Sequence, residues 1–353
     1  MTRSSAAHFP TFGPGAIISE ARLANIDLRG RDLSNCVFEN VDLRCANLTS
    51  TNITHTIFRN CDLSSACLDG TALSDSQWSD TTLADATLRQ AQASNATFAR
   101  SVMTRADLRT ARLENCTFDR CDLNDSSFVN ARLFRSASVA CSFDKSNFSG
   151  ADLSRFTALG APLNNAIFAN TALVQAFFAN ADLTEQRFPD CDLTLCQFTA
   201  AKLQKADFSG ARLIQTRFDN ASLDGATFAK AVGRQVRFAG ASLVGADLSE
   251  VNMRVANFNE AIMTDCLMQA AHFQQVLFVG ADLKRVALDH AILVDCDLSH
   301  VNLSGADCSH VQFGNANFHA LIAEQTNWNH ADCSNTLPTD PVRLRGETWP
   351  ARS

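Results

Sequence analysis

The sequence predicts an all-β solenoid, in which short repeats wind into stacked coils. The first observation is a five-residue period. From Ile18 to Cys333 every fifth residue keeps one register, and 57 of these 64 positions hold Leu, Ile, Met, Phe or Trp. This period fits neither the helical repeat of about 3.6 residues nor the two-residue alternation of a long strand. A short fixed period is typical of a solenoid, whose units bury their apolar side only by stacking on their neighbours.

The second observation, the spacing of aromatic residues, sets the length of one coil. Aromatic residues recur every twenty residues in two series. The first series is Phe38, Phe58, Trp78, Phe98, Phe118 and then Phe178 to Phe278, and the second is Phe128, Phe148, Phe168, Phe188, Phe208 and Phe228. Four pentapeptides therefore make one coil, and the 64 repeats make about sixteen coils.

The third observation is a small residue two positions before each central one, as in Ala46-Asn47-Leu48-Thr49-Ser50 and Ala206-Asp207-Phe208-Ser209-Gly210. This motif resembles the pentapeptide-repeat family, and the resemblance covers about nine-tenths of the chain. The resemblance implies a single-stranded, right-handed quadrilateral β-helix.

The repeat divides the chain into three segments. Residues 1–17 lack the repeat and are expected to form an N-terminal cap, residues 18–333 the β-helix, and residues 334–353 a C-terminal tail or cap. Caps are expected because a bare β-helix end exposes an unpaired ladder. Pro338, Pro341 and Pro350 exclude a long helix from the tail. Leu337, Val342, Leu344 and Trp349 are candidates to cover the last coil.

Composition favours a cytoplasmic protein. No apolar run approaches the about 20 residues of a membrane helix, and the first residues do not read as a signal peptide. Delivery by a secretion system that needs no signal peptide stays open. Of thirteen cysteines, eleven fall on inward positions of the repeat, where a reduced thiol serves as a small apolar residue. Nine of these occupy the small corner position, while Cys308 and Cys333 are central.

The sequence contains no recognisable motif of catalysis or cofactor binding, so we expect neither an enzyme nor a bound cofactor. Asp residues are plentiful, but many of them immediately precede a central Leu and follow the repeat. These are Asp27, Asp32, Asp42, Asp62, Asp107 and Asp152.

One histidine arrangement is a candidate metal site. His290, His310 and His330 each follow a central position by two residues and are one coil apart, so they are expected to stack about 5 Å apart at one corner. Imidazoles so placed suit a transition metal. The competing interpretation is an exposed polar corner. His300 lies on the opposite corner, and His319 on an adjoining face.

Outward residues supply candidates for partner binding. Phe134, Phe177, Val174 and Ile214 are large apolar residues at outward positions. Residues 60–88 carry Asp without Lys or Arg, whereas residues 202–237 are rich in basic residues. Three of these basic residues, Arg212, Arg234 and Arg237, are further candidates. Such charge stretches can orient a protein partner, and solvation alone also explains them.

These observations favour a monomeric, non-enzymatic scaffold that binds another protein. The family resemblance suggests a bacterial accessory protein or effector associated with secretion. The alternative is a DNA mimic that binds gyrase and protects against quinolones or toxins, although the net charge of −7 is mild for a mimic. Binding to nucleic acid is not expected, because the aromatic residues that stack on bases are assigned inward.

Overall fold

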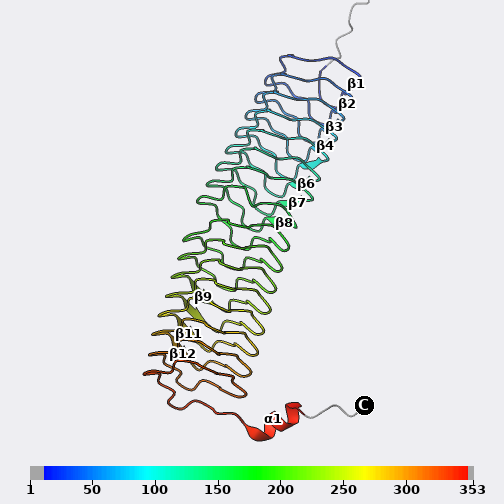
Figure 1. Ribbon diagram of the computed structural model, residues 1–353. Coiled ribbons are helices and arrows are strands. Elements are labelled where there is room, and N and C mark those ends of the chain that lie inside the picture. Colours follow the sequence, from blue (N-terminus) through cyan, green and yellow to red (C-terminus); the bar gives the residue numbers. More distant parts are fainter. Residues whose placement is uncertain (1–11, 349–353) are drawn as a thin grey trace, which may run out of the picture. The chain divides into compact units, whose positions relative to one another are not determined.

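The structure is a computed structural model that describes residues 12–348. The chain forms two compact units: the first reaches Phe156 and includes Asn165–Ile167, and the second holds Thr157–Asn164 and the chain from Phe168 onward. In each unit the chain winds in stacked coils joined by parallel pairing (Figure 1). The structure is a parallel β-solenoid, which confirms the predicted fold class.

The strands are three residues long and centred on one inward residue. The first unit contains β1 (Ile17–Ser19), β2 (Val37–Glu39), β3 (Ile57–Arg59), β4 (Gln77–Ser79), β5 (Thr97–Ala99), β6 (Thr117–Asp119) and β7 (Ala137–Val139). The second unit contains β8 (Thr157–Leu159), β9 (Val232–Arg234), β10 (Asn252–Arg254), β11 (His272–Gln274), β12 (Ile292–Val294) and the helix α1 (Pro341–Thr348). Partners are twenty residues apart, as in Phe38↔Phe58 and Met253↔Phe273, which matches the predicted coil length.

The strands are short because the backbone turns at the last residue of each repeat. This residue has a positive φ, for example 61° at Asn25 and 59° at Asn35. Gly, Asn and Asp adopt this left-handed conformation more readily than other residues do. The residue before the central one stabilises the same turn. In the repeats centred on Leu28, Leu63 and Leu153, the Asp side chain accepts a hydrogen bond from the backbone N–H two residues on.

The six aspartates assigned to the repeat all make this local bond, at Asp27, Asp32, Asp42, Asp62, Asp107 and Asp152. An Asp or Asn in this position offers its oxygen to the turn, as in Asx turns elsewhere. The structure therefore gives these aspartates a backbone role.

The core consists of ladders of stacked side chains. In the first unit, the rings of Phe38, Phe58, Trp78 and Phe98 stack with centroids 4.0–5.7 Å apart. The indole N–H of the buried Trp78 donates to the Ser76 hydroxyl at 2.8 Å. In the second unit, two Phe ladders run side by side and meet edge to face. Their rings include those of Phe218 and Phe228, whose centroids are 5.6 Å apart.

The solenoid has about 14 turns, slightly fewer than the sixteen predicted. In the last repeats, Ala323 and Trp328 are only half-buried and Cys333 is exposed. Within residues 12–348, no further coil follows to cover them.

The cysteines at inward positions support the interpretation that they pack in the core as small apolar residues. Every cysteine is a free thiol. Eight of the nine corner cysteines are buried and Cys191 is half-buried; Cys308 is buried. The prediction was wrong for Cys333, which lies in the uncovered last coil. Burial raises the pKa of Cys116, Cys196 and Cys266 to about 12, so these thiols stay protonated.

The tail contains one short helix and no long one. α1 begins after Asp340, whose carboxylate accepts hydrogen bonds from the backbone N–H groups of Val342 and Arg343 at 2.8 and 3.2 Å. This is the arrangement of an N-terminal helix cap. Val342 is 78% exposed, so it does not cover the last coil as expected. Trp349 and Pro350, like residues 1–11, lie outside the described residues. Within residues 12–348, no helix has the length and apolar character to cross a membrane.

Candidate functional site

The structure places His290, His310 and His330 in one stack. Each occupies the turn position of its repeat, with φ values of 59°, 58° and 59°. The imidazole centroids of His290 and His310 are 4.6 Å apart, and those of His310 and His330 are 4.9 Å apart, with the rings nearly parallel. The predicted spacing of about 5 Å is therefore confirmed, while metal binding stays a prediction. We call these three residues the histidine column.

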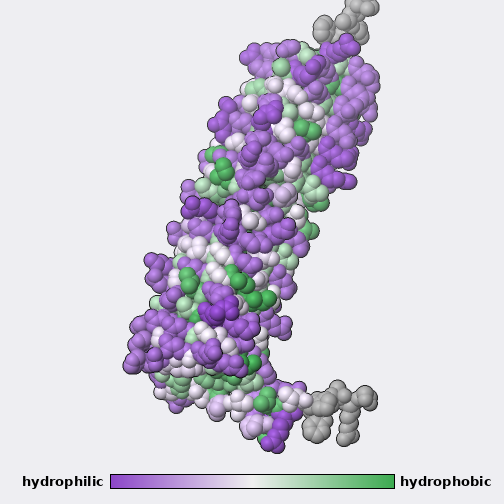
Figure 2. Space-filling view, in the orientation of Figure 1, coloured by the Kyte–Doolittle hydropathy of each residue, from purple (hydrophilic) through white to green (hydrophobic). Residues whose placement is uncertain are grey.

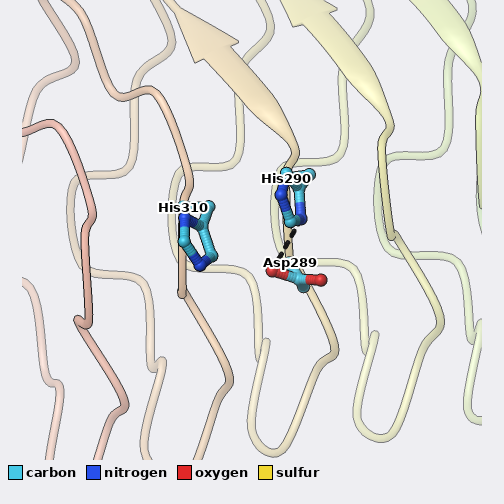
Figure 3. A group of neighbouring side chains, drawn as sticks. All are labelled: Asp289, His290 and His310. Atoms are coloured by element: carbon cyan, nitrogen blue, oxygen red, sulfur yellow. Dashed lines mark ion pairs between the residues drawn. The ribbon is translucent and has the colours of Figure 1, made fainter.

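Asp289 orients the first ring of the column. Its Oδ1 lies 2.9 Å from Nδ1 of His290, and the Ser309 hydroxyl donates to the same oxygen at 3.1 Å (Figure 3). The hydrogen bonds from His290 and Ser309 lower the pKa of the Asp289 carboxyl. The carboxylate therefore stays ionised and accepts a hydrogen bond from the protonated Nδ1 of His290.

A second histidine cluster connects the tail to the solenoid. His319 is buried, and its Nε2 lies 3.0 Å from Oε2 of Glu347 in α1; Nε2 of His300 lies 3.1 Å from the same oxygen. Arg343 Nε donates to Oε1 of Glu347 at 2.7 Å. The hydrogen bonds from His319 and Arg343 lower the pKa of the Glu347 carboxyl. We call His300, His319 and Glu347 the cap cluster.

Sequence reasoning missed the cap cluster. The repeat count places His300 and His319 near each other, one on a corner and one on a face. It gives no position for Glu347, because the tail leaves the repeat and its path depends on tertiary contacts. Glu347 lies in a segment of mixed apolar and charged residues between Pro341 and Pro350, and this composition does not specify a contact.

The structure brings three partner-binding candidates onto one sheet. Arg212 bridges to Val232 of β9, Ile214 lies one coil before Arg234, and Arg234 ends β9. We define the β9–β12 face as the outward side chains of this sheet and of the coil before it. These are Arg212, Ile214, Val232, Arg234, Asn252, Arg254, His272, Gln274, Ile292 and Val294. Val174 lies in the same column, two coils before Ile214.

The other candidates lie elsewhere. Phe177 and Arg237 belong to a different ladder, and Arg237 is paired with Asp219 at 3.0 Å. Phe134 is in the first unit and half-buried, where the guanidinium groups of Arg135 and Arg155 lie 5.1 and 5.8 Å from its ring centroid. These cations cover the ring, so the outward position of Phe134 is explained without a partner protein.

The surface has few large hydrophobic groups. Figure 2 shows surface hydrophobic side chains as small groups among hydrophilic ones. The hollow lined by Asp219, Arg237 and Glu260 is open and polar rather than an enclosed pocket.

The repeats of the chain match models of a known protein family. A sequence model described as pentapeptide repeats matches residues 21–60, 46–77, 176–215, 191–229, 234–269 and 281–319, and a second one matches residues 83–127. The search of curated proteins gave no match.

Several solved structures of pentapeptide-repeat proteins match part or most of the chain at low TM-scores. A pentapeptide repeat protein from the thylakoid lumen of Arabidopsis thaliana is 24% identical, with 29% of this chain and 70% of that chain covered and a TM-score of 0.28. QnrB1, a plasmid-mediated fluoroquinolone resistance protein, is 16% identical, with 62% and 92% covered and a TM-score of 0.31. HetL, involved in heterocyst differentiation in Nostoc, is 18% identical, with 93% and 91% covered and a TM-score of 0.16.

The family assignment rests on the sequence matches, which span more than half of the chain, and on the twenty-residue parallel coils that the same repeats form. On this evidence, the chain belongs to the pentapeptide-repeat family.

Proposed function

We propose that this protein is a non-enzymatic scaffold that binds an acidic segment of another protein on the β9–β12 face. The observation that carries the proposal is the charge of this face. Arg212, Arg234 and Arg254 are exposed, and none of the ten outward positions holds Asp or Glu. No residue in the described part of the chain forms an ion pair with Arg234 or Arg254, and Arg212 has a single contact of 4.0 Å with Asp192.

Several arginines elsewhere in the chain are paired with an Asp. Arg100, Arg105 and Arg285 each make two short hydrogen bonds to an Asp one coil before them. Such bidentate pairs leave little charge available to a partner. On the β9–β12 face the guanidinium groups retain their donors for carboxylates supplied from outside. Arg234 and Arg254 are about 4.8 Å apart in the strand-pairing direction, which suits an acidic segment.

Apolar groups lie on the same sheet as the arginines. Val232 is 46% exposed, and Ile292 and Val294 are half-buried on the same sheet. Val255 adjoins the face at its corner, is 42% exposed and has a φ of 55°. A β-branched residue is strained in this conformation, and such strain often marks functional sites. A mixture of arginine and apolar groups on a preorganised surface is typical of protein interfaces.

The chemistry of the inward and turn residues supports a role without catalysis. Burial raises the pKa of the Cys296 and Cys308 thiols to about 12, so these two thiols lack nucleophilic thiolate. The repeat aspartates are engaged in turns. An accessory role in secretion is a narrower form of the proposal and rests on the family resemblance alone.

The test compares capture by the full-length chain and by two charge-reversal variants. Arg234→Glu with Arg254→Glu reverses the β9–β12 face. Arg112→Glu with Arg132→Glu is the matched control. These two arginines of the first unit are also exposed and also one coil apart, and each directly precedes the central residue of its repeat. Cross-linked partners from the native cell are quantified by mass spectrometry.

The proposal expects at least one protein whose contact region is acidic and whose recovery falls about tenfold or more with the face variant and not with the control. Equal recovery with both variants would overturn the assignment of this face. Inhibition of gyrase supercoiling by the purified chain, unchanged in the face variant, would support the DNA-mimic alternative instead.

A further inference from the structure

The histidine column differs from the cap cluster in the state of its ring nitrogens. A metal-binding imidazole uses one nitrogen as the ligand and donates the proton on the other to a carboxylate or carbonyl group. In the column, Nδ1 of His290 lies 2.9 Å from Oδ1 of Asp289. A carboxylate only accepts hydrogen bonds, so the proton of a neutral His290 lies on Nδ1 and the lone pair lies on Nε2.

The cap cluster has the opposite arrangement. The backbone N–H of Asp340 donates to Nδ1 of His319 at 3.1 Å, so the proton of a neutral His319 lies on Nε2 and points to Glu347. A metal at Nε2 would require a proton on Nδ1, directly opposed to the Asp340 N–H. Although its ligand atoms are close together, this cluster is built as a set of hydrogen bonds between α1 and the solenoid.

We propose that the histidine column binds one divalent transition-metal ion, such as Ni²⁺ or Zn²⁺, through imidazole nitrogens of the neighbouring pair His290 and His310. Neutral imidazole is a preferred ligand for these metals. The Asp289–His290 pair reproduces the carboxylate–histidine arrangement of metal sites.

The geometry of the column is close to that of a site. The candidate ligand atoms of Asp289, His290 and His310 lie within 4.8 Å of one another. In a tetrahedral site with metal–nitrogen bonds of about 2.0–2.1 Å, ligand nitrogens lie about 3.3 Å apart. Parallel rings must therefore tilt toward each other. His290 and His310 are exposed at a corner (Figure 3), where side chains rotate without disturbing the core.

The arrangement also predicts an open coordination position. Two imidazoles from successive coils approach the ion from one side, because both rings stand on the same corner. Water or a ligand from outside the chain then completes the coordination.

The test is isothermal titration of the full-length chain with Ni²⁺ or Zn²⁺ alone, at a pH about one unit above the ordinary imidazole pKa of about 6.5. His310→Asn removes one of the two imidazole ligands and keeps a residue that tolerates positive φ. His55→Asn is the matched control, because His55 has the same repeat position and a φ of 56° but no neighbouring histidine. Circular dichroism verifies that each variant is folded.

We expect one ion per chain for the natural sequence and for His55→Asn, and at least tenfold weaker binding for His310→Asn. Asp289→Asn should weaken binding about 10- to 100-fold through the loss of ring orientation. Undetectable binding by the natural sequence, or unchanged affinity in His310→Asn, would overturn the proposal. Loss of binding in His319→Gln with full binding in His310→Asn would place the ion in the cap cluster and overturn it as well.

Discussion

At the scale of single residues, the last position of each repeat is governed by backbone conformation. Asn, Gly and Asp are the commonest residues in these turns, and each adopts positive φ with little steric penalty. Val255 departs from this preference with a φ of 55°. Its side chain is branched at Cβ, so the turn is strained without any compensating burial. We relate this strain to the adjoining β9–β12 face.

The first prediction concerns Val255. Replacing Val255 with Asn should stabilise the folded state by about 1 kcal/mol, because it relieves a left-handed β-branched residue. The reverse change one coil before, Gln235→Val at a φ of 59°, should destabilise it by a similar amount. Urea denaturation followed by circular dichroism measures both. A Val255→Asn variant that is less stable than the natural chain would contradict this account.

Gly233 is a second residue at which the repeat is broken. Gly233 stands at a central position normally filled by a large apolar side chain. The space is filled by Val236, since a Cβ on residue 233 would lie 2.4 Å from Val236 Cγ2. Val236 is fully buried. The two residues therefore compensate for each other, because Val236 fills the volume that a large side chain at residue 233 would occupy.

The second prediction follows from this exchange. Gly233→Ala should destabilise the fold by about 1–3 kcal/mol through overpacking. Gly233→Leu combined with Val236→Ala restores the ordinary repeat pattern, and should be more stable than Gly233→Leu alone. Gly314→Ala is the control, because its nearest neighbour, Val294 Cγ2, is at an ordinary 3.7 Å. Denaturation midpoints decide it, and equal loss in Gly233→Ala and Gly314→Ala would refute the compensation.

At the scale of elements, α1 is attached by polar contacts. None of its residues is buried, so the hydrophobic effect contributes little to holding α1 in position. The attachment instead uses the cap cluster, Arg343, and the Thr339 hydroxyl, which accepts a hydrogen bond from the backbone N–H of Ala320 at 3.1 Å. Through these contacts the tail satisfies part of the last coil's unpaired backbone edge.

The third prediction concerns this attachment. Glu347→Gln should reduce amide protection in α1 and in the last coil, because it removes the carboxylate shared by His300, His319 and Arg343. Glu324→Gln is the control. Glu324 is an exposed acidic residue of the last coil and forms no ion pair with a described residue. Hydrogen exchange at neutral pH provides the measurement. Equal protection in the two variants would show that α1 docks without the cap cluster.

At the scale of the molecule, stability is expected to depend on ionised turn aspartates. The side chains of Arg29 and Arg44 lower the pKa of Asp27 and Asp42, respectively, to about 2. At Asp107, burial acts to raise the pKa, but hydrogen bonds from Arg109 and Arg89 outweigh it and lower the pKa to about 2. Hydrogen bonds from Ser34 and Ser334 lower the pKa of Asp32 and Asp332.

The fourth prediction is acid destabilisation in a defined pH window. A carboxyl with a lowered folded pKa stabilises the fold above its unfolded pKa of about 3.9, and this contribution is lost as the pH falls through the folded value. The thermal midpoint should therefore drop steeply between about pH 4 and pH 2. The drop should persist in about 1 M salt, where general charge repulsion is screened beyond about 3 Å. A midpoint independent of pH in this window would contradict the prediction.

The repeat explains why much of the structure was predictable. Each inward position has local requirements that a sequence displays: a small corner residue, a large central residue and a turn former. For the same reason the histidine column was found, because residues twenty apart in a regular solenoid must stack. The partner-binding candidates were predicted one residue at a time. Only the structure distinguishes Arg234, which lies on an open face, from Arg237, which is paired with Asp219.

The sequence by itself determined the parallel coils, the twenty-residue register, the buried cysteines within the stacked coils and the histidine column. All of these follow from a period that repeats one local solution. Tertiary structure alone decided the uncovered last coil, the Gly233–Val236 exchange, the cap cluster and the isolated charge of the β9–β12 face. These depend on what lies beside a residue across coils or beyond the repeat, and a local period carries no information about those neighbours.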